Sequence, residues 1–510
     1  MIAYRSPLRK RRREAPEGVW GGRSEAMPVA EADAAMPKPN LVFIFTDEQR
    51  LDTMRAYGNE RIRTPNLDAL ARGAVVFANA YVTQPVCSPS RASIMTGLYP
   101  HTCGCVANNI PLPGEIPTIA EMFKDSDYRF AYHGKWHLGD EIFAQHGFTD
   151  WISIEDGYRK HYGPGRDPTA HCSYYQWLVA QGFTPEGGDA DFAVFPRRQN
   201  AGFPAEYSKP EFLARTASRF IRENREHPFV LYVNYLEPHM PFTGPYDQMY
   251  RPEEVTLPAN FDTPPHPDEP LKCRHLRQRY AQGSGERDLS TEAGWRRLIA
   301  NYWGLVSLVD ESVGRILATL SECGLDERTL VVFTSDHGDM MGSHRLLAKT
   351  VMYQEAVRVP LLMRIPWLSA TPGRMDAPVS QIDLVATLLD LLGQPVPGTQ
   401  GHSLGPLLEG RGGPAEDHVF IEWNGRDGEP EPREGTAERA SGSAIRGVIS
   451  PDGWKLNLSA ADKSELYHLA ADPLETENLF YSGRHDAVIR HLSDRIRRWQ
   501  EETGDGVSVM

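Results

Sequence analysis

The stretch NLVFIFTDEQ, residues 40–49, decides the fold. A short, continuous apolar run that ends in acidic side chains is typical of a strand buried in a parallel sheet, with its carboxyl end at a functional site. Strands that alternate with helices predict an α/β fold, with a large, mostly parallel central sheet flanked by helices. Right-handed crossovers would bring the strand ends to one edge, where such folds place their sites. The apolar runs of this pattern lie in 64–82, 118–139, 227–242 and 329–339.

The two ends of the chain differ in composition from this central part. Residues 1–37 hold a basic cluster with no apolar core behind it, which predicts a disordered N-terminal tail rather than a secretory signal. A hairpin pattern with a Pro-Asp-Gly turn at 444–458 and an amphipathic helix at 485–502 predict a smaller C-terminal antiparallel α+β subdomain. Because a chain of 510 residues suits two or more domains, we place them at 38–405 and 406–510.

Three internal segments lack a clear period. Residues 157–215 and 243–285 are rich in Pro, Gly, Tyr and charged side chains, and we expect them to form long excursions that shape a substrate pocket. The Gly- and Glu-rich stretch 424–444 is typical of a mobile loop. No internal repeat accompanies these segments.

Composition excludes several classes of function. A net charge of −14 argues against nucleic-acid binding, which needs clustered Lys and Arg, but it leaves room for an anionic small substrate. Six scattered cysteines are too few for a disulfide framework and favour a reducing compartment. No apolar run of about 18 residues is present, so we expect no membrane span and a cytoplasmic location. The oligomeric state stays open.

Ionisable side chains follow the apolar runs, where the strand ends would meet. Asp47, Asp336 and His337 supply the oxygen and nitrogen ligands that a divalent cation prefers. Glu48 stands directly beside the first of these carboxylates. An Asp after a strand is more often a helix cap than a ligand, so only the joint pattern favours a metal site.

Cations and imidazoles gather at the same predicted edge. Lys135, Lys349 and Arg91 suit an anionic, tetrahedral substrate group. His137 and His239 are candidates for proton transfer. Together with a divalent cation, such a set points to hydrolysis of a sulfate or phosphate ester.

Several blocks of the chain resemble the type I sulfatases, a family with the alkaline-phosphatase-like fold. The most specific is CSPSRASIMTG at 87–97, which resembles the family signature Cys-x-Pro-Ser-Arg followed by Thr-Gly. The resemblance covers residues 38–480 and implies that 38–405 is a sulfatase catalytic domain. The other blocks, in family order, are FTDEQ (45–49), GKWHLG (134–139), EPHMPF (237–242), TSDHGDMMGSH (334–344), AKTVMYQEAVRVPLLMRIP (348–366) and ELYHLAADPLETENL (465–479).

The resemblance implies a modified nucleophile and a metal. In this family the cysteine, here Cys87, is oxidised to formylglycine by a formylglycine-generating enzyme, and the hydrated aldehyde attacks the ester. The metal would be held by Asp47, the modified Cys87, Asp336 and His337, with calcium as the first choice. The nitrogen ligand also keeps manganese or another divalent metal open. Many sulfatases carry a second Asp where this chain has Glu48, so whether Glu48 is a ligand is open.

The resemblance also implies a role for each remaining candidate. Arg91 would hold the diol, while Lys135 and Lys349 stabilise charge on the sulfuryl oxygens. His239, with or without Lys349, would protonate the leaving alcohol. His137 would take the proton from the second hydroxyl and release sulfate.

Two other functions stay open. A phosphonate monoester or phosphodiester hydrolase of the same superfamily shares the formylglycine and the Asp-His metal pair, but Lys135 and His137 together look more like a sulfatase. A catalytically idle protein could instead bind sulfated ligands through the same cations. We therefore expect hydrolysis of a small-molecule or carbohydrate sulfate ester to alcohol and inorganic sulfate.

Overall fold

The computed structural model describes residues 38–189, 192–283, 288–368, 373–412, 417–425 and 442–509. The expected N-terminal tail, 1–37, and residues 426–441 of the expected loop at 424–444 lie outside these residues. All six cysteines are free, as expected of a chain without a disulfide framework. In the part of the chain that the structure describes, no helix is both long and apolar enough to cross a membrane.

The main sheet of the described chain has nine strands and confirms the predicted mostly parallel α/β fold. Its central strands are parallel, and only β9 and β10 run antiparallel to their neighbours. The order is β11-β2-β10-β8-β1-β7-β3-β4, with β9 paired to β2. The bounds are β1 Asn40–Asp47, β2 Val75–Tyr81, β3 Arg129–Gly134, β4 Asp150–Ser153, β7 Phe229–Pro238, β8 Thr329–Ser335, β9 Arg358–Val359, β10 Leu361–Arg364 and β11 Arg374–Ser380.

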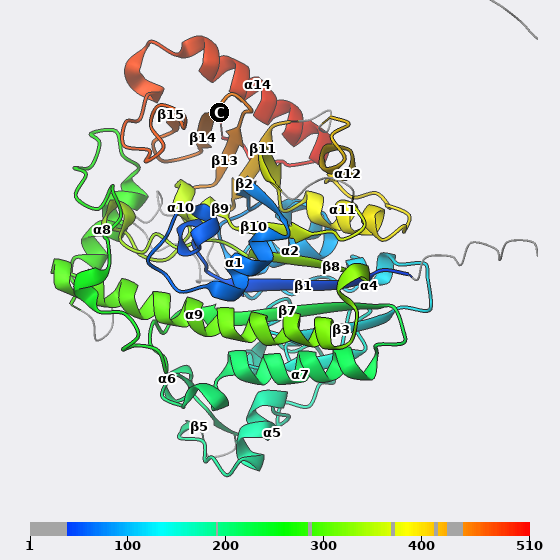
Figure 1. The fold of residues 1–510 in the computed structure, drawn as a ribbon. Helices are drawn as coiled ribbons and strands as arrows, with labels where there is room; N and C mark the ends of the chain where they lie inside the picture. The colour runs from blue at the N-terminus through cyan, green and yellow to red at the C-terminus, as the bar shows by residue number, and fades with distance from the viewer. Residues whose placement is uncertain are drawn as a thin grey trace, which may run out of the picture. The chain divides into compact units, whose positions relative to one another are not determined.

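Helices cover both faces of this sheet (Figure 1). Alternate side chains of β1 enter two separate cores, because successive residues of a strand point to opposite faces. Figure 1 shows α7 and α9 side by side along one face, where α1 and α5 also pack. The helices of this face are α1 Pro65–Arg72, α5 Ser173–Ala180, α7 Lys209–Glu223 and α9 Glu292–Glu322, and those of the other are α2 Cys87–Thr96, α4 Ile119–Met122, α11 Asp383–Leu391 and α12 Gly405–Leu408.

Neighbouring strand ends bring the predicted side chains together. β1 lies between β7 and β8, with Phe45 paired to Asn234 and Thr46 to Ser335. Because all three strands are parallel, Asp47, Asp336 and the segment after Pro238 leave the sheet at the same edge. β3 lies next to β7, which adds Lys135 directly after its last residue.

A second, antiparallel sheet follows in the C-terminal region, as the hairpin and helix patterns predict. Its order is β12-β13-β14-β15, and α14 packs on it through Leu492, Ile496 and Trp499. Whether a domain boundary falls at residue 405 stays a prediction. The bounds are β12 Val419–Trp423, β13 Ile445–Ile449, β14 Trp454–Ser459, β15 Glu465–His468 and α14 Asp486–Thr503.

The two long excursions contain regular elements that their weak periodicity hides. Residues 157–215 hold α5, the start of α7 and a two-stranded ribbon, while 243–285 hold α8. Two side chains of the first segment reach the site edge, where Tyr158 packs on His137 and Arg197 contacts His239. The remaining bounds are β5 Gly187–Asp189, β6 Phe192–Val194, α3 Pro100–Cys103, α6 Arg197–Ala201, α8 Leu271–Tyr280 and α10 Gln354–Val357.

Candidate active site

Cys87 is the first residue of α2, and its thiol lies over the ends of β1 and β8. Its Sγ is 3.3 Å from Nε2 of His337 and 3.7 Å from Oδ1 of Asp47. The side chain is 1% exposed, and burial raises the pKa of the thiol to about 12, assisted by the charge of Asp47. An unmodified thiol in this position would therefore hold its proton at neutral pH.

Four side chains bring one potential ligand atom each within 4.8 Å of one another: Asp47, Cys87, Asp336 and His337. His337 Nδ1 lies 2.9 Å from the carbonyl oxygen of Gly338, which only accepts, so Nδ1 carries the proton and Nε2 keeps a free lone pair toward Cys87. Two carboxylates and such an imidazole fit a divalent cation. All four were expected as ligands from the sequence, which also left Glu48 open as a fifth.

Arg91 bridges the carboxylates of Asp47 and Asp336. Its Nη2 lies 2.7 Å from Oδ2 of Asp47 and 2.9 Å from Oδ2 of Asp336, while Nη1 donates to the backbone oxygen of Lys135 at 2.9 Å and to Asn234 Oδ1 at 2.5 Å. Each of these side chains is 1% exposed or less. The guanidinium therefore balances two buried negative charges and fixes their orientation.

Lys135 and Lys349 supply the other cations. Lys135 Nζ lies 2.5 Å from Asp47 Oδ2, and Lys349 Nζ lies 2.9 Å from Glu48 Oε2. Burial alone would raise the pKa of Asp47, but Lys135 and the other nearby cations lower it well below its usual range. Asp47 therefore stays ionised and available as a ligand.

Glu48 faces Lys349 and His239 rather than Cys87. Its backbone N–H donates to Asp336 Oδ1 at 3.0 Å, and its φ of 70° turns the chain sharply after β1. Burial raises the pKa of its carboxyl to about 8, against the opposing effect of Lys349. Together with Asp47 and His239 it forms a second group of potential ligand atoms, so its part in metal binding stays a prediction.

His239 lies just beyond β7 with its two ring nitrogens facing different partners. Nδ1 is 2.8 Å from the carbonyl oxygen of Met240, and Nε2 is 3.4 Å from Glu48 Oε2. Burial and the charge of Lys349 lower the pKa of this imidazole well below its usual value. Nε2 is thus the nitrogen that faces the site.

His137 reaches the site from the turn after β3. Its backbone N–H and that of Trp136 donate to the two oxygens of Glu141, at 2.6 and 2.8 Å, which holds His137 at a φ of 58°. Nε2 lies 3.1 Å from Asn109 Oδ1, and the ring packs on Tyr158 with centroids 4.6 Å apart. Burial and Lys135 lower the pKa of His137 well below its usual value.

Every predicted site residue thus lies at this edge of the sheet. Sequence analysis did not identify the residues that contact them and hold them in place. Asn234 carried a signal, because it interrupts an otherwise apolar strand. Tyr158 and Arg197 carried only a general signal, since they lie in the segment 157–215 that was expected to shape a substrate pocket. Asn109 and Glu141 carried none, since each lies in a turn.

The fold and its cluster of ligating and cationic side chains are those of an alkaline-phosphatase-like hydrolase. The sulfatase family model matches residues 39–394, and a model of the C-terminal region of N-sulphoglucosamine sulphohydrolase matches residues 342–502. The chain therefore belongs to the sulfatase family and is an enzyme of the sulfuric ester hydrolase class, as its sequence motifs predicted.

Relatives match over nearly the whole chain. A multifunctional alkaline phosphatase superfamily protein, PehA of Trinickia caryophylli, is 29% identical over 92% of this chain and 96% of its own length. An ulvan-active sulfatase of Formosa agariphila is 28% identical over 92% of this chain and 82% of its own length. Among solved structures, a phosphonate monoester hydrolase of Silicibacter pomeroyi superposes with a TM-score of 0.76 at 25% identity, covering 92% of this chain and 96% of the other.

Proposed function

We propose that this enzyme hydrolyses a sulfate monoester to an alcohol and inorganic sulfate, with Cys87 converted to formylglycine as its nucleophile. The observation that carries the proposal is the position of Cys87, whose Sγ lies 3.3 Å from His337 and beside Asp47. Because the pKa of the thiol is raised to about 12, an unmodified Cys87 would be a poor nucleophile. Conversion requires a formylglycine-generating enzyme as a maturation partner.

The divalent cation we propose is calcium, with manganese as the alternative, held by Asp47, Asp336, His337 and the modified Cys87. When bound, it would supply a Lewis-acid charge beside the sulfuryl oxygens. Lys135 contacts Asp47, and Lys349 contacts the neighbouring Glu48. The charges of both lysines would therefore stabilise the transition state. Arg91 would keep the position of Cys87 aligned with both carboxylates.

Two histidines would move the protons. His239 presents Nε2 to the site beside Lys349, and the low pKa of this imidazole favours its neutral form. The proton for the leaving oxygen would therefore come from the cationic Lys349, directly or through Nε2 of His239. His137, whose low pKa favours the neutral imidazole, would accept the proton that leaves the nucleophile in the second step. Asn109 and Glu141 would hold His137 in place for that transfer.

The substrate we propose is a sulfated carbohydrate or another small sulfate ester. A second candidate is a phosphonate monoester hydrolase, favoured by the structural likeness to the enzyme of Silicibacter pomeroyi. Lys135 and His137 favour the sulfatase. We would therefore measure kcat/KM of metal-loaded, converted enzyme for 4-nitrophenyl sulfate, 4-nitrophenyl phenylphosphonate and bis(4-nitrophenyl) phosphate. A larger value for the sulfate supports the proposal, a larger value for either phosphorus ester supports the alternative, and binding without turnover supports an idle binder.

A further inference from the structure

Arg197, the first residue of α6, reaches the far side of His239. Its Nη1 lies 3.4 Å from His239 Nδ1, and its side chain is 33% exposed. No sequence motif pointed to this residue. Its contact with a side chain that would protonate the leaving oxygen places it where the leaving group of a substrate would extend.

The hydrogen bonds of His239 and Arg197 leave Nη1 available. Met240 O only accepts, so His239 Nδ1 must carry a proton to make its 2.8 Å contact. Arg197 Nη1 then faces another donor and gains no hydrogen bond from it. The other edge of the guanidinium is engaged, because Nε and Nη2 donate to the two oxygens of Glu155 at 2.9 and 2.5 Å.

Glu155 holds the guanidinium rigidly without cancelling the local positive charge. Its side chain is 5% exposed, and Lys209 Nζ also donates to its Oε1 at 2.9 Å. Two positive side chains and one carboxylate give the trio one net positive charge. Burial raises the pKa of the neighbouring Glu237 carboxyl, against the opposing effect of Lys209.

A cavity lies beside this fixed cation. Arg197 lines a cavity of about 330 Å³ together with Glu155, Asp156, Tyr158, Tyr175, Phe195 and Lys209. The carboxylate of Asp156 accepts a hydrogen bond from the backbone N–H of Cys172 at 2.6 Å. It also lines a smaller cavity of about 30 Å³ together with His239. The larger volume falls in the range of small-molecule sites, and its aromatic walls suit a ring.

We propose that Arg197 binds a negatively charged oxygen substituent, a carboxylate or a second sulfate, on the leaving group of the substrate. The inference rests on the proposed function, because it takes His239 to mark the leaving-group side. Nη1 would donate to the substituent while the ring to which it is attached lies along Tyr158. Arg197 thus selects among sulfate esters and takes no part in the chemical step.

The test compares two substrates that differ only in that substituent. We would measure kcat/KM for phenyl sulfate and 3-carboxyphenyl sulfate with the wild type, Arg197→Met and the neighbouring exposed control Arg198→Met. The wild type should prefer the carboxylated ester, and Arg197→Met should lower the ratio of the two values by about ten- to a hundred-fold, the worth of a charged hydrogen bond. Arg198→Met should keep the ratio.

An unchanged ratio in Arg197→Met would overturn the inference, as would an equal fall in Arg198→Met. Because loss of Arg197 leaves the buried Glu155 with Lys209 alone, the double variant Arg197→Met/Glu155→Gln serves if the single variant does not fold. It should lower the ratio to the same extent.

A binding measurement separates this inference from the proposed function. By calorimetry, 3-hydroxybenzoate should bind the wild type at least about ten-fold more tightly than phenol does, and Arg197→Met should lose that difference. If the wild type hydrolyses neither ester but keeps the Arg197-dependent binding, the proposed function is wrong, and only the anion-binding role of Arg197 stands. If the two products bind equally, the inference is wrong whatever the turnover.

Discussion

The Sγ atom of Cys87 lies 3.3 Å from Nε2 of His337, and both side chains are removed from solvent. In many enzymes such a pair is a cysteine activated by a histidine base. Here Nε2 of His337 also faces the carboxylates of Asp47 and Asp336. The pKa of the Cys87 thiol is raised rather than lowered. The pair therefore suits a metal site with a modified side chain better than a thiolate nucleophile.

The first prediction concerns this side chain. Protein made in a host that contains a formylglycine-generating enzyme should show a peptide at Cys87 lighter by about 18 Da, as conversion of a thiol to an aldehyde requires. Cys87→Ala should lose nearly all turnover on sulfate esters, because the side chain proposed as the nucleophile would be missing. Peptide mass spectrometry and a kinetic assay check both. Near-normal turnover of Cys87→Ala would contradict the prediction.

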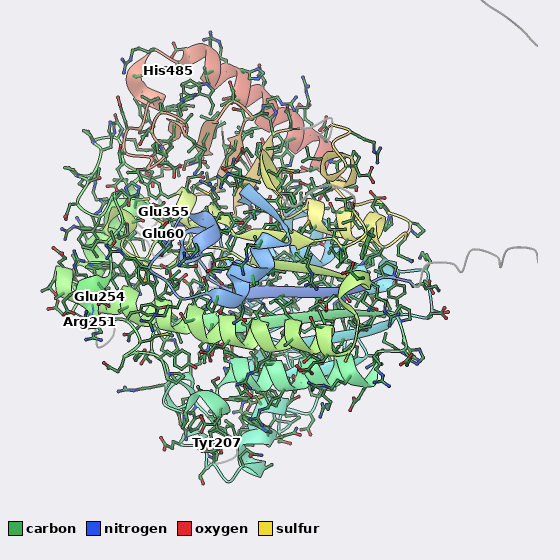
Figure 2. All side chains as sticks on the ribbon, viewed as in Figure 1. Glu60, Tyr207, Arg251, Glu254, Glu355 and His485 are labelled. Atoms are coloured by element: carbon green, nitrogen blue, oxygen red, sulfur yellow. The ribbon has the colours of Figure 1, made fainter. Side chains whose placement is uncertain are left out.

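Arg91 should matter for stability as well as for activity. Arg91→Met leaves Asp47 and Asp336 buried without their shared cation, so in chelator the free energy of unfolding should fall by about 3–5 kcal/mol. The control is Arg251→Met, which breaks an exposed ion pair with Glu254 (Figure 2) and should cost less than about 1 kcal/mol. Urea titration followed by fluorescence and circular dichroism measures both. Equal losses would argue against the role of Arg91.

Metal binding should stabilise the folded chain through Asp336. At a concentration of calcium or manganese about a hundred-fold above its Kd, linkage predicts about 2.7 kcal/mol of added stability, seen as a rise in Tm. Asp336→Asn should weaken this response, whereas the exposed control Asp376→Asn should keep it. A wild-type Tm that ignores both metals would contradict the assignment of the site.

Sequence reasoning brought the candidate ligands together because each of them follows a strand at a position that the fold determines. Asp47 and Asp336 each follow an apolar run, and two parallel neighbouring strands must end at the same edge. Cys87 and Arg91 were identified by the motif at 87–97, in which the spacing between the two residues is part of the pattern. The sense of β10 was beyond reach, since a short apolar run reads alike in parallel and antiparallel pairing.

The residues that position the candidate site residues could not be predicted, for a different reason. Glu141 and Arg197 act through turns and a five-residue helix, whose positions depend on contacts far along the chain. The 31-residue helix α9 also escaped notice, because polar residues such as Asn301 and Asp310 are buried among its apolar ones and blur the period. Tertiary packing, which no local pattern records, decides both cases.

The last prediction concerns Asp310, a buried carboxyl on α9. It accepts hydrogen bonds from the backbone N–H of Leu67 at 2.7 Å and from Nδ2 of Asn66 at 2.8 Å, at the start of α1. Burial nevertheless raises its pKa from 3.8 to about 6. Between these two values the native state binds a proton that the unfolded state has lost, so the free energy of unfolding should fall as pH rises from about 4 to 6.

Asp310→Asn cannot titrate, and its other effects on packing are independent of pH. The stability of the wild type minus that of Asp310→Asn should therefore decrease by about 1–3 kcal/mol between pH 4 and pH 6.5, measured by urea titration. A difference that increases with pH would mean that the amide donors of α1 outweigh burial and favour the carboxylate. In that case Asp310 would stabilise the start of α1 as an anion, and the raised pKa would be wrong.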